Sequence, residues 1–414
     1  MRVLHLLDPA VLRATDYRSR TLALIDQLRA QGVHTVHLAG PERMAGMRPA
    51  EHSDVNMHAA MPERPGSSGL HIYRTHDPER PRWLPRPCAP VLSITAWALR
   101  LRQVARLTRP DLIHVHASNW NALAALPAAC GGALPLIAET ERRLGSASSS
   151  PGRLSGFGAG SHLWERWALT RARALAAPSL EMRAALRGAG LGGRRIAVIP
   201  PAADVDANLT GMARTGRMPR GLEGAPLLGY AGRLEHNEGI DLLLSILPAL
   251  RRRHPALRLV VAGGGAREDE LAARIHGSNA RGHVVFTGAL PSRRAADVLP
   301  RADIAVFPAL PGGSAELAPS RHLMNAMAQG CAIVASDIAC HRELLTHGHS
   351  GMLFHAGSRA ALAEMLLGLL DCPERQRALG TAAAICAASR HSWTVTAASY
   401  RRLYEDVLTQ GCKH

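Results

Sequence analysis

Short apolar runs alternate with amphipathic segments over residues 227–354, and most of these runs end in glycine or polar residues. The run 322–330, HLMNAMAQG, is predicted to be a helix. Apolar runs that alternate with helices predict a parallel sheet covered on both faces, whose ligands bind beyond the carboxyl ends of the strands. The predicted strands open or lie within the segments 227–244, 257–265, 283–288, 302–310 and 331–337.

The same alternation, less regular, covers the first half of the chain. Residues 41–90 predict a long surface excursion around one strand, and 144–161 a loop rich in glycine and serine. The predicted strands are 2–7, 33–40, 70–75, 110–117, 134–140, 174–179 and 194–204, and the predicted helices include 19–32, 94–109, 118–132 and 162–174.

The chain has 414 residues, which favours two domains. Residues 205–222 lack periodicity and are predicted to be a linker, so we expect one domain over 1–205 and a second over 222–389. Apolar residues at helical spacing over 393–408 predict a last helix, within 390–410, that packs back on the first domain. The fold class is therefore α/β, with two doubly wound, Rossmann-like domains.

The charge is strongly basic, with a net charge of +16, and Lys413 is the only lysine beside 48 arginines. Such a surface attracts nucleic acid, anionic lipid or phosphorylated substrates. No nucleic-acid-binding signature is present, so we expect no nucleic-acid partner. Seven scattered cysteines without a CxxC pair, no signal peptide and no spanning apolar run indicate a cytoplasmic protein without a disulfide framework or structural zinc.

Several motifs together resemble glycosyltransferase family 4. They are GRLxxxxGID, VVAGGG, VFTG, ADIAVFP, AMAQGCAIVASDIACHRELL and HGHSGMLF, with IHVHA in the first half. The branch that they resemble most is that of the PEP-CTERM/exosortase-associated glycosyltransferases. The resemblance implies a GT-B fold and retaining transfer of a sugar from a nucleotide diphosphate sugar. The donor is then expected on the second domain, a glycan or lipid-linked acceptor on the first, and no metal or cofactor.

Arg233, at the end of the first strand of the second half, matches the family's arginine that contacts the diphosphate. The alternative is a surface arginine in a turn. Glu238 stands where the family usually has a lysine, so one expected cation is missing and a carboxylate repels the anion.

A second donor segment is the loop GGSAEL, in which Gly312 and Gly313 let the backbone approach a ligand closely and Ser314 is a further donor-binding candidate. Glu316 matches the first of two family glutamates and is expected to act in catalysis by holding the donor sugar. The alternative is a helix-capping carboxylate. The helix that follows offers its N–H groups to phosphate or sugar oxygens.

The second family glutamate is replaced by Asn325, which accepts hydrogen bonds from the ribose more weakly than a carboxylate. Arg321 and His322 lie on the same segment and are predicted to supply positive charge to the diphosphate.

His116 matches a family histidine that faces the cleft, and we expect it to be catalytic by orienting the acceptor or contacting the donor sugar. Of His114 and His116, one is expected to face inward as an ordinary core histidine. Glu139, at the next strand end, is predicted on the acceptor side, where Glu141 replaces an expected arginine.

The first loop contributes Tyr17 and Arg18 as acceptor-side candidates. Relatives have a glycine beside them that lets the donor phosphate approach. Here Asp16 takes that place, and its carboxylate crowds and repels an anion.

The helix over 98–109 carries arginines on one face and apolar residues on the other. It is interpreted first as a helix packed on its sheet, and second as a surface that docks on an anionic membrane where a lipid-linked acceptor lies. Two functions compete with sugar transfer. The departures at Asp16, Glu141, Glu238 and Asn325 favour a degenerate binding protein, and the shared fold leaves a sugar-nucleotide epimerase open.

Overall fold

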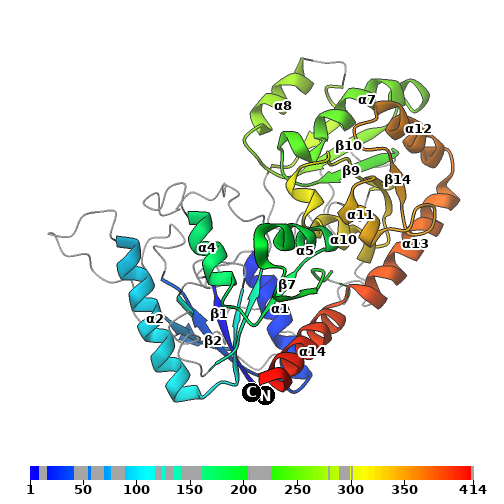
Figure 1. Cartoon of the computed structure of the whole chain (residues 1–414). Helices are drawn as coiled ribbons and strands as arrows, with labels where there is room; N and C mark the ends of the chain where they lie inside the picture. The colour runs from blue at the N-terminus through cyan, green and yellow to red at the C-terminus, as the bar shows by residue number, and fades with distance from the viewer. Residues whose placement is uncertain are drawn as a thin grey trace. The chain divides into compact units, whose positions relative to one another are not determined.

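A computed structural model of the chain shows two compact units, each built on its own sheet (Figure 1). The first unit comprises 1–178, 182–199 and 396–414, and the second comprises 179–181 and 200–395. Residues 206–224, which hold nearly all of the predicted linker, lie outside the described residues, so the linker stays a prediction. The described residues are 1–8, 16–41, 55–56, 70–75, 89–116, 124–125, 134–140, 161–203, 205, 225–277, 280–288, 299 and 302–411.

The first unit has an eight-stranded sheet whose neighbouring strands are parallel, except that β3 is antiparallel to β4. The strand order is β3-β4-β2-β1-β5-β6-β7-β8, so the connections reverse direction between β1 and β5. Ligands of such sheets bind at this switch point. The strands are β1 (Arg2–Leu7), β2 (His34–Ala39), β3 (Val55–Asn56), β4 (His71–Arg74), β5 (Leu112–Val115), β6 (Leu136–Glu139), β7 (Ala174–Ala177) and β8 (Arg195–Val198).

Five α-helices and one π-helical turn, Arg187–Leu191, accompany this sheet among the described residues. The α-helices are α1 (Asp16–Ala30), α2 (Ala89–Thr108), α4 (Ser161–Leu169), α5 (Leu180–Leu186) and α14 (Trp393–Gly411). Helix α2 begins five residues before the predicted start at Ile94, since Val91 and Leu92 extend the helical run. Its buried face carries Trp97 and Leu101. From Thr396 onward α14 belongs to the first unit, although it follows the whole second unit in the chain.

The second unit has a six-stranded, wholly parallel sheet in the order β11-β10-β9-β12-β13-β14. It contains the five predicted strands and one more, β14, in the segment HGHSGMLF. The sequence analysis noted that segment as a motif and did not predict a strand there. The strands are β9 (Leu227–Ala231), β10 (Arg258–Ala262), β11 (Val284–Phe286), β12 (Ile304–Phe307), β13 (Ala332–Ser336) and β14 (Met352–Phe354).

The second sheet is buried on both faces, because successive side chains of a strand point to opposite sides. Leu228 joins one apolar core, with α7 (Ile240–Arg253) and α12 (Arg359–Leu370). Its neighbour Leu227 joins the other core, with α10 (Arg321–Ala328) and α13 (Pro373–Arg390). This two-sided burial confirms the doubly wound α/β prediction. Two further helices are α8 (Glu268–His276) and α11 (Ala339–Leu344).

Helices α10 and α13 approach each other closely at two glycines. A Cβ atom on Gly380, inside α13, would lie 2.1 Å from the carbonyl oxygen of Gly330, just past α10. A glycine inside a helix costs about 0.5–1 kcal/mol relative to alanine. Close packing between the helices is therefore the reason for glycine at this position.

We predict that Gly380→Ala lowers the free energy of unfolding by about 1–3 kcal/mol, because the added methyl group forces the two helices apart. Gly368→Ala is the matched control, since Gly368 lies inside exposed α12 sequence with nothing within 4 Å of an added Cβ. That control should be neutral or more stable by about 0.5–1 kcal/mol. Thermal and denaturant unfolding measure both variants, and equal stabilities would contradict the close-packing argument.

Candidate functional site

Three loops at the carboxyl edge of the second sheet are bonded to one another through their backbones. The N–H of Leu234, after β9, donates to the carbonyl of Gly264, after β10, at 3.1 Å. The N–H of Leu310, after β12, donates to the carbonyl of Asn237 at 2.8 Å. Backbone bonding fixes the spacing of the loops without using their side chains.

Two glycines permit this close approach. Gly239 has φ +74°, and a Cβ there would lie 1.8 Å from the carbonyl oxygen of Pro308. Gly263 has φ +151°, and a Cβ there would lie 1.8 Å from the carbonyl oxygen of Gly232. Any side chain at either position would push the loops apart, so the edge of the sheet depends on both glycines.

Arg233 lies in the loop after β9 with half of its side chain exposed. Its guanidinium is 3.4 Å from the Glu235 carboxylate and 3.5 Å from the Glu238 carboxylate. Its backbone carbonyl accepts a hydrogen bond from the Tyr230 hydroxyl at 2.9 Å. Glu238, which we expected to repel an anion, thus pairs with the predicted anion-binding cation, so a bound diphosphate must compete with two carboxylates.

Glu316 belongs to a 3-10 turn, Ser314–Glu316, and its side chain returns to the loop before it. One carboxylate oxygen accepts a hydrogen bond from the N–H of Gly312 at 2.6 Å. The carboxylate therefore closes its own loop, and it does not cap α10. This turn contacts the 3-10 turn His236–Glu238, which follows Arg233 in the chain. The structure thus brings the Arg233 and Glu316 loops side by side.

Gly312 and Gly313 serve this loop in different ways. Gly312 has φ +78°, and a Cβ on Gly313 would lie 2.9 Å from the Cβ of Asn237. Both positions therefore favour glycine, one for its backbone angle and the other for lack of space. Ser314 lies in the same turn, but its side chain is outside the described residues.

Helix α10 follows the loop and carries the remaining donor candidates. Arg321, His322 and Asn325 are each partly exposed, whereas Leu323 and Met324 are buried. The preceding residue, Ser320, makes no side-chain cap at the helix start. The partly exposed face of α10 thus presents the three predicted side chains together, next to a helix N-terminus.

Helix α11 packs against the Glu316 turn. The thiol of Cys340 donates to the backbone carbonyl of Glu316 at 2.8 Å, and burial raises the pKa of this thiol to about 12. Next to it, His341 is buried and its Nδ1–H donates to the carbonyl of Ser336 at 2.8 Å. Burial lowers the pKa of His341 to about 4. The sequence analysis missed the contact with Glu316 because 24 residues separate the partners.

In the first unit, buried polar side chains from three adjacent strands meet at the switch point. We call His5, His114, His116 and Glu139 the histidine cluster. His5 Nδ1 lies 2.8 Å from His116 Nε2, and the Glu139 oxygens lie 3.3 Å from His114 Nε2 and 3.4 Å from His116 Nδ1. The hydroxyl of Tyr404, from α14, is 2.7 Å from His114 Nδ1. Sequence analysis missed His5, which appeared only as part of a strand, and Tyr404, which is 290 residues from His114.

The expectation that only one of His114 and His116 faces the core was wrong. Residues two apart in a strand point to the same face, so both rings approach the Glu139 carboxylate and both are buried. Each ring nitrogen of His116 lies within 3.4 Å of a cluster member. His116 and Glu139 are thus directed at each other, and their predicted roles toward the acceptor stay predictions.

The cluster combines two neutral rings, those of His5 and His114, with an ionised acid. Burial lowers the pKa of His114 to about 4 and that of His5 well below its usual value. Burial alone would raise the pKa of Glu139, but the adjacent imidazoles of His116 and His114 hold it well below its usual value. The carboxylate is therefore an anion in the interior of the first unit.

The other predicted acceptor-side residues are less fully described. Tyr17 and Arg18 lie in the first turn of α1, together with Asp16, and their side chains are outside the described residues. Glu141 is also outside them. Their predicted contributions are unchanged by the structure.

Two parallel-sheet units, with converging loops at a carboxyl edge, define a class of α/β proteins that bind ligands beyond their strand ends. Residues 218–385 match the family model of glycosyl transferases group 1, and residues 18–207 match that of Glycosyltransferase Family 4. A glycogen synthase of Mycobacterium tuberculosis is 30% identical over 321 residues, which cover 74% of this chain and 72% of the relative. The chain belongs to glycosyltransferase family 4, with the GT-B fold.

Other relatives match over a shorter length. A phosphatidyl-myo-inositol mannosyltransferase of Mycolicibacterium smegmatis is 34% identical over 197 residues, which cover 46% of this chain. The chain spans about half the length of the mannosyltransferases it matches, 49% in this case. Among solved structures, a sucrose-phosphate synthase from Thermosynechococcus elongatus has a TM-score of 0.73 at 16% identity, covering 99% of this chain and 100% of that one. That likeness shows the fold.

The buried His341 predicts a pH dependence of stability. Its pKa is about 4 when folded and about 6.5 when unfolded, so below pH 6.5 the unfolded chain binds the extra proton. The stability due to a neutral His341 is complete above pH 6.5 and is lost as the pH falls toward 4, by up to about 1.4 kcal/mol per pH unit.

We therefore expect His341→Asn to flatten the pH profile of the free energy of unfolding between pH 6.5 and 4. An asparagine amide can still donate to the Ser336 carbonyl, which limits other damage. Denaturant titrations at several pH values compare the variant with the wild type. Parallel profiles for the two proteins would show that His341 does not take up a proton on unfolding.

Proposed function

We propose that this protein is a retaining glycosyltransferase that moves a sugar from a nucleotide diphosphate sugar to a glycan or lipid-linked acceptor of exopolysaccharide assembly. The observation that carries the proposal is the carboxyl edge of the second sheet. There the loops of Arg233 and Glu316 are in contact, and the Glu316 loop precedes the start of α10. Cations, free N–H groups and a sugar-binding carboxylate are what a leaving diphosphate and its sugar require.

Within this site each residue has a distinct role. Arg233 stabilises the charge that develops on the leaving diphosphate, assisted by Arg321 and His322. The backbone at Gly312, Gly313 and Ser314 comes close to the donor, and the Glu316 carboxylate binds hydroxyl groups of its sugar. Asn325 accepts from the ribose with a neutral oxygen. Loss of the charge-assisted bond weakens donor binding by about 1–2 kcal/mol.

Uridine nucleotides are the donors to test first. Alr3699/HepE of Anabaena, which matches this chain with a TM-score of 0.66, has been solved with UDP, and a further structure contains UDP-glucose. The first unit then takes the acceptor, near Tyr17, Arg18, His116 and Glu139. A lipid-linked acceptor is supported by the mannosyltransferase relative, whose name specifies a phosphatidylinositol.

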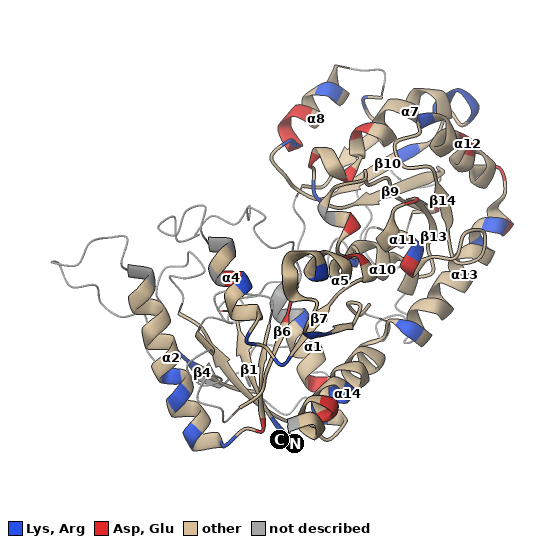
Figure 2. Ribbon diagram, in the orientation of Figure 1, with Lys and Arg blue, Asp and Glu red and all other residues tan. Residues whose placement is uncertain are grey.

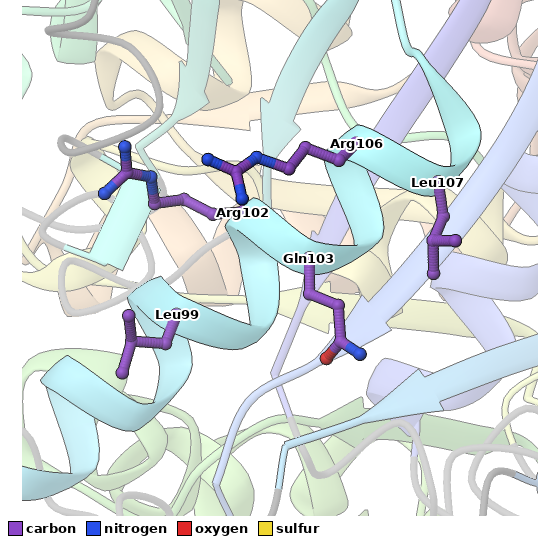
Figure 3. A pocket seen from close by; sticks show the side chains of 5 residues that line it. All are labelled: Leu99, Arg102, Gln103, Arg106 and Leu107. Carbon is purple, nitrogen blue, oxygen red and sulfur yellow. The ribbon is translucent and has the colours of Figure 1, made fainter.

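The outer face of α2 supports a peripheral site on the inner, anionic surface of the plasma membrane. Leu99 and Leu107 are 61% and 68% exposed, and with Arg102, Gln103 and Arg106 they line a shallow groove on the helix (Figure 3). Figure 2 shows the basic residues along α2. Apolar side chains among arginines suit insertion between anionic headgroups. No described helix combines the length and apolarity needed to span a bilayer.

A binding protein without turnover is the second candidate, and one observation favours it. The two carboxylates near Arg233 offset the charge that a diphosphate needs. Product analysis separates the candidates, because a transferase gives a glycosylated acceptor and a binding protein gives no product. An epimerase would convert the donor sugar when no acceptor is present.

For the donor site, we predict that Arg233→Ala weakens the binding of UDP and UDP-glucose at least tenfold, as loss of a charged hydrogen bond costs about 1.5–3 kcal/mol. Glu238→Gln should tighten binding several-fold, since it removes a repelling charge 3.5 Å from Arg233. Isothermal titration measures both. Arg342→Ala is the control, because Arg342 is similarly exposed and pairs with Asp337 instead.

If Arg233→Ala and Arg342→Ala bind the nucleotides equally well, Arg233 does not contact the diphosphate. If the folded wild type binds neither uridine nor guanosine diphosphate sugars, the transferase proposal fails.

For the membrane site, we predict a weaker membrane affinity for the double variant Leu99→Ser, Leu107→Ser. It should bind vesicles in which about one third of the lipid is anionic about tenfold more weakly than the wild type, since each leucine contributes apolar burial. Vesicle co-sedimentation at two salt concentrations measures this. Ile385→Ser is the control, because Ile385 is also 65% exposed but lies in α13. Equal binding by all three proteins would remove α2 from the membrane contact.

A further inference from the structure

The loop after β9 is attached to the rest of the second unit at three consecutive residues. The N–H groups of Gly232 and Leu234 each donate to a main-chain carbonyl at or just past the end of β10, both at 3.1 Å. Between them, the carbonyl of Arg233 accepts a hydrogen bond from the hydroxyl of Tyr230 at 2.9 Å. Of these three bonds, the one to Arg233 is the one that a side chain makes.

The Tyr230 bond controls the peptide group that follows the Arg233 side chain. The carbonyl of Arg233 and the N–H of Leu234 belong to one planar peptide group. This group is therefore held at both ends, and it cannot rotate without breaking a hydrogen bond. Without the tyrosine hydroxyl it would pivot about its N–H. Because the guanidinium lies several bonds from the backbone, a small rotation at the peptide produces a larger displacement at the tip of the side chain.

The surroundings of Tyr230 place its hydroxyl at this carbonyl. The residue is 2% exposed and belongs to the apolar core that contains α7. A Cβ on Gly232 would lie 2.9 Å from the Tyr230 oxygen, so the hydroxyl occupies the space that a side chain there would need. Burial raises the pKa of Tyr230, which keeps the hydroxyl protonated and able to donate. A phenylalanine would fill the same core, so it is the hydrogen bond that requires a tyrosine.

The charges around Arg233 make its backbone position important. The guanidinium lies 3.4 Å from the Glu235 carboxylate and 3.5 Å from the Glu238 carboxylate. Both separations are longer than the roughly 2.7–2.9 Å of a strong charge-assisted hydrogen bond. A side chain whose backbone is fixed cannot shorten either contact by moving the loop. The fixed backbone thus keeps both pairs weak enough for an anionic ligand to replace them.

We propose that Tyr230 is a positioning residue for donor binding, whose hydroxyl fixes the backbone of Arg233 and so directs the guanidinium to the diphosphate of the nucleotide sugar. The inference rests on the proposed function, because it requires Arg233 to bind a diphosphate. Tyr230 is buried and acts through the main chain, without touching the substrate. The sequence analysis did not single it out, since it lies inside a predicted strand.

The test is a double-mutant cycle on nucleotide affinity, measured by isothermal titration with UDP, or with GDP if the wild type prefers guanosine. Tyr230→Phe should weaken binding about three- to tenfold, the effect of one lost hydrogen bond. In an Arg233→Ala background the same change should weaken binding less than about twofold, since no guanidinium remains to be directed. The bond to the backbone carbonyl exists in both backgrounds, so a purely structural role would give equal effects.

Tyr404→Phe is the matched control. It also removes a buried, hydrogen-bonded tyrosine hydroxyl, but in the first unit, and it should bind the nucleotide as the wild type does. Gly232→Ala covers a Tyr230 variant that fails to fold. Its added methyl group displaces the tyrosine hydroxyl, so the same cycle with this variant should give the same pattern.

Two results would overturn the inference while the proposed function stands. One is an unchanged nucleotide affinity in the folded variant. The other is an equal weakening with and without the Arg233 guanidinium. If the folded wild type binds neither UDP nor GDP, the proposed function fails, and the role of Tyr230 in donor binding fails with it.

Discussion

The close approach of backbones at the carboxyl edge of the second sheet is the constraint on which the proposed donor site depends. At Gly239 and Gly263 a neighbouring carbonyl oxygen occupies the place of a side chain. The distances between the loops after β9, β10 and β12 are consequently fixed by the sheet from which they extend. The distances between side chains on these loops are limited in the same way. For this reason Arg233 and Glu316, separated by more than eighty positions in the chain, lie on loops in contact.

The two units use charge in opposite ways. In the second unit, cations and carboxylates are partly exposed, and their pairing near Arg233 is weak enough for a ligand to exchange with it. In the first unit, an ionised Glu139 is surrounded by buried rings, where unpaired polar atoms are costly. The first arrangement suits a substrate that comes and goes. The second suits a permanently bound group or a fixed network of hydrogen bonds.

The sequence alone predicted the α/β class, the two parallel sheets and most strands, because short apolar runs that end in glycine or polar residues and alternate with helices indicate buried parallel strands. It also predicted the loops around Arg233 and Gly312, where glycines follow strand ends. It failed where contacts join distant segments. Neither the Cys340 bond to Glu316 nor the convergence of His5 with His114 leaves a local signal, since each arises from strand order. The spacing of His114 and His116 was informative, but it indicated a shared face rather than opposite ones.

The position of α14 has a consequence for how the protein is made. Residues 396–414 belong to the first unit, and Tyr404 contacts His114 there, yet the whole second unit is synthesised in between. During translation the first unit therefore stays incomplete, with the rings of its interior uncovered on one side, until α14 leaves the ribosome. The second unit, continuous apart from a three-residue segment, can fold while that wait continues.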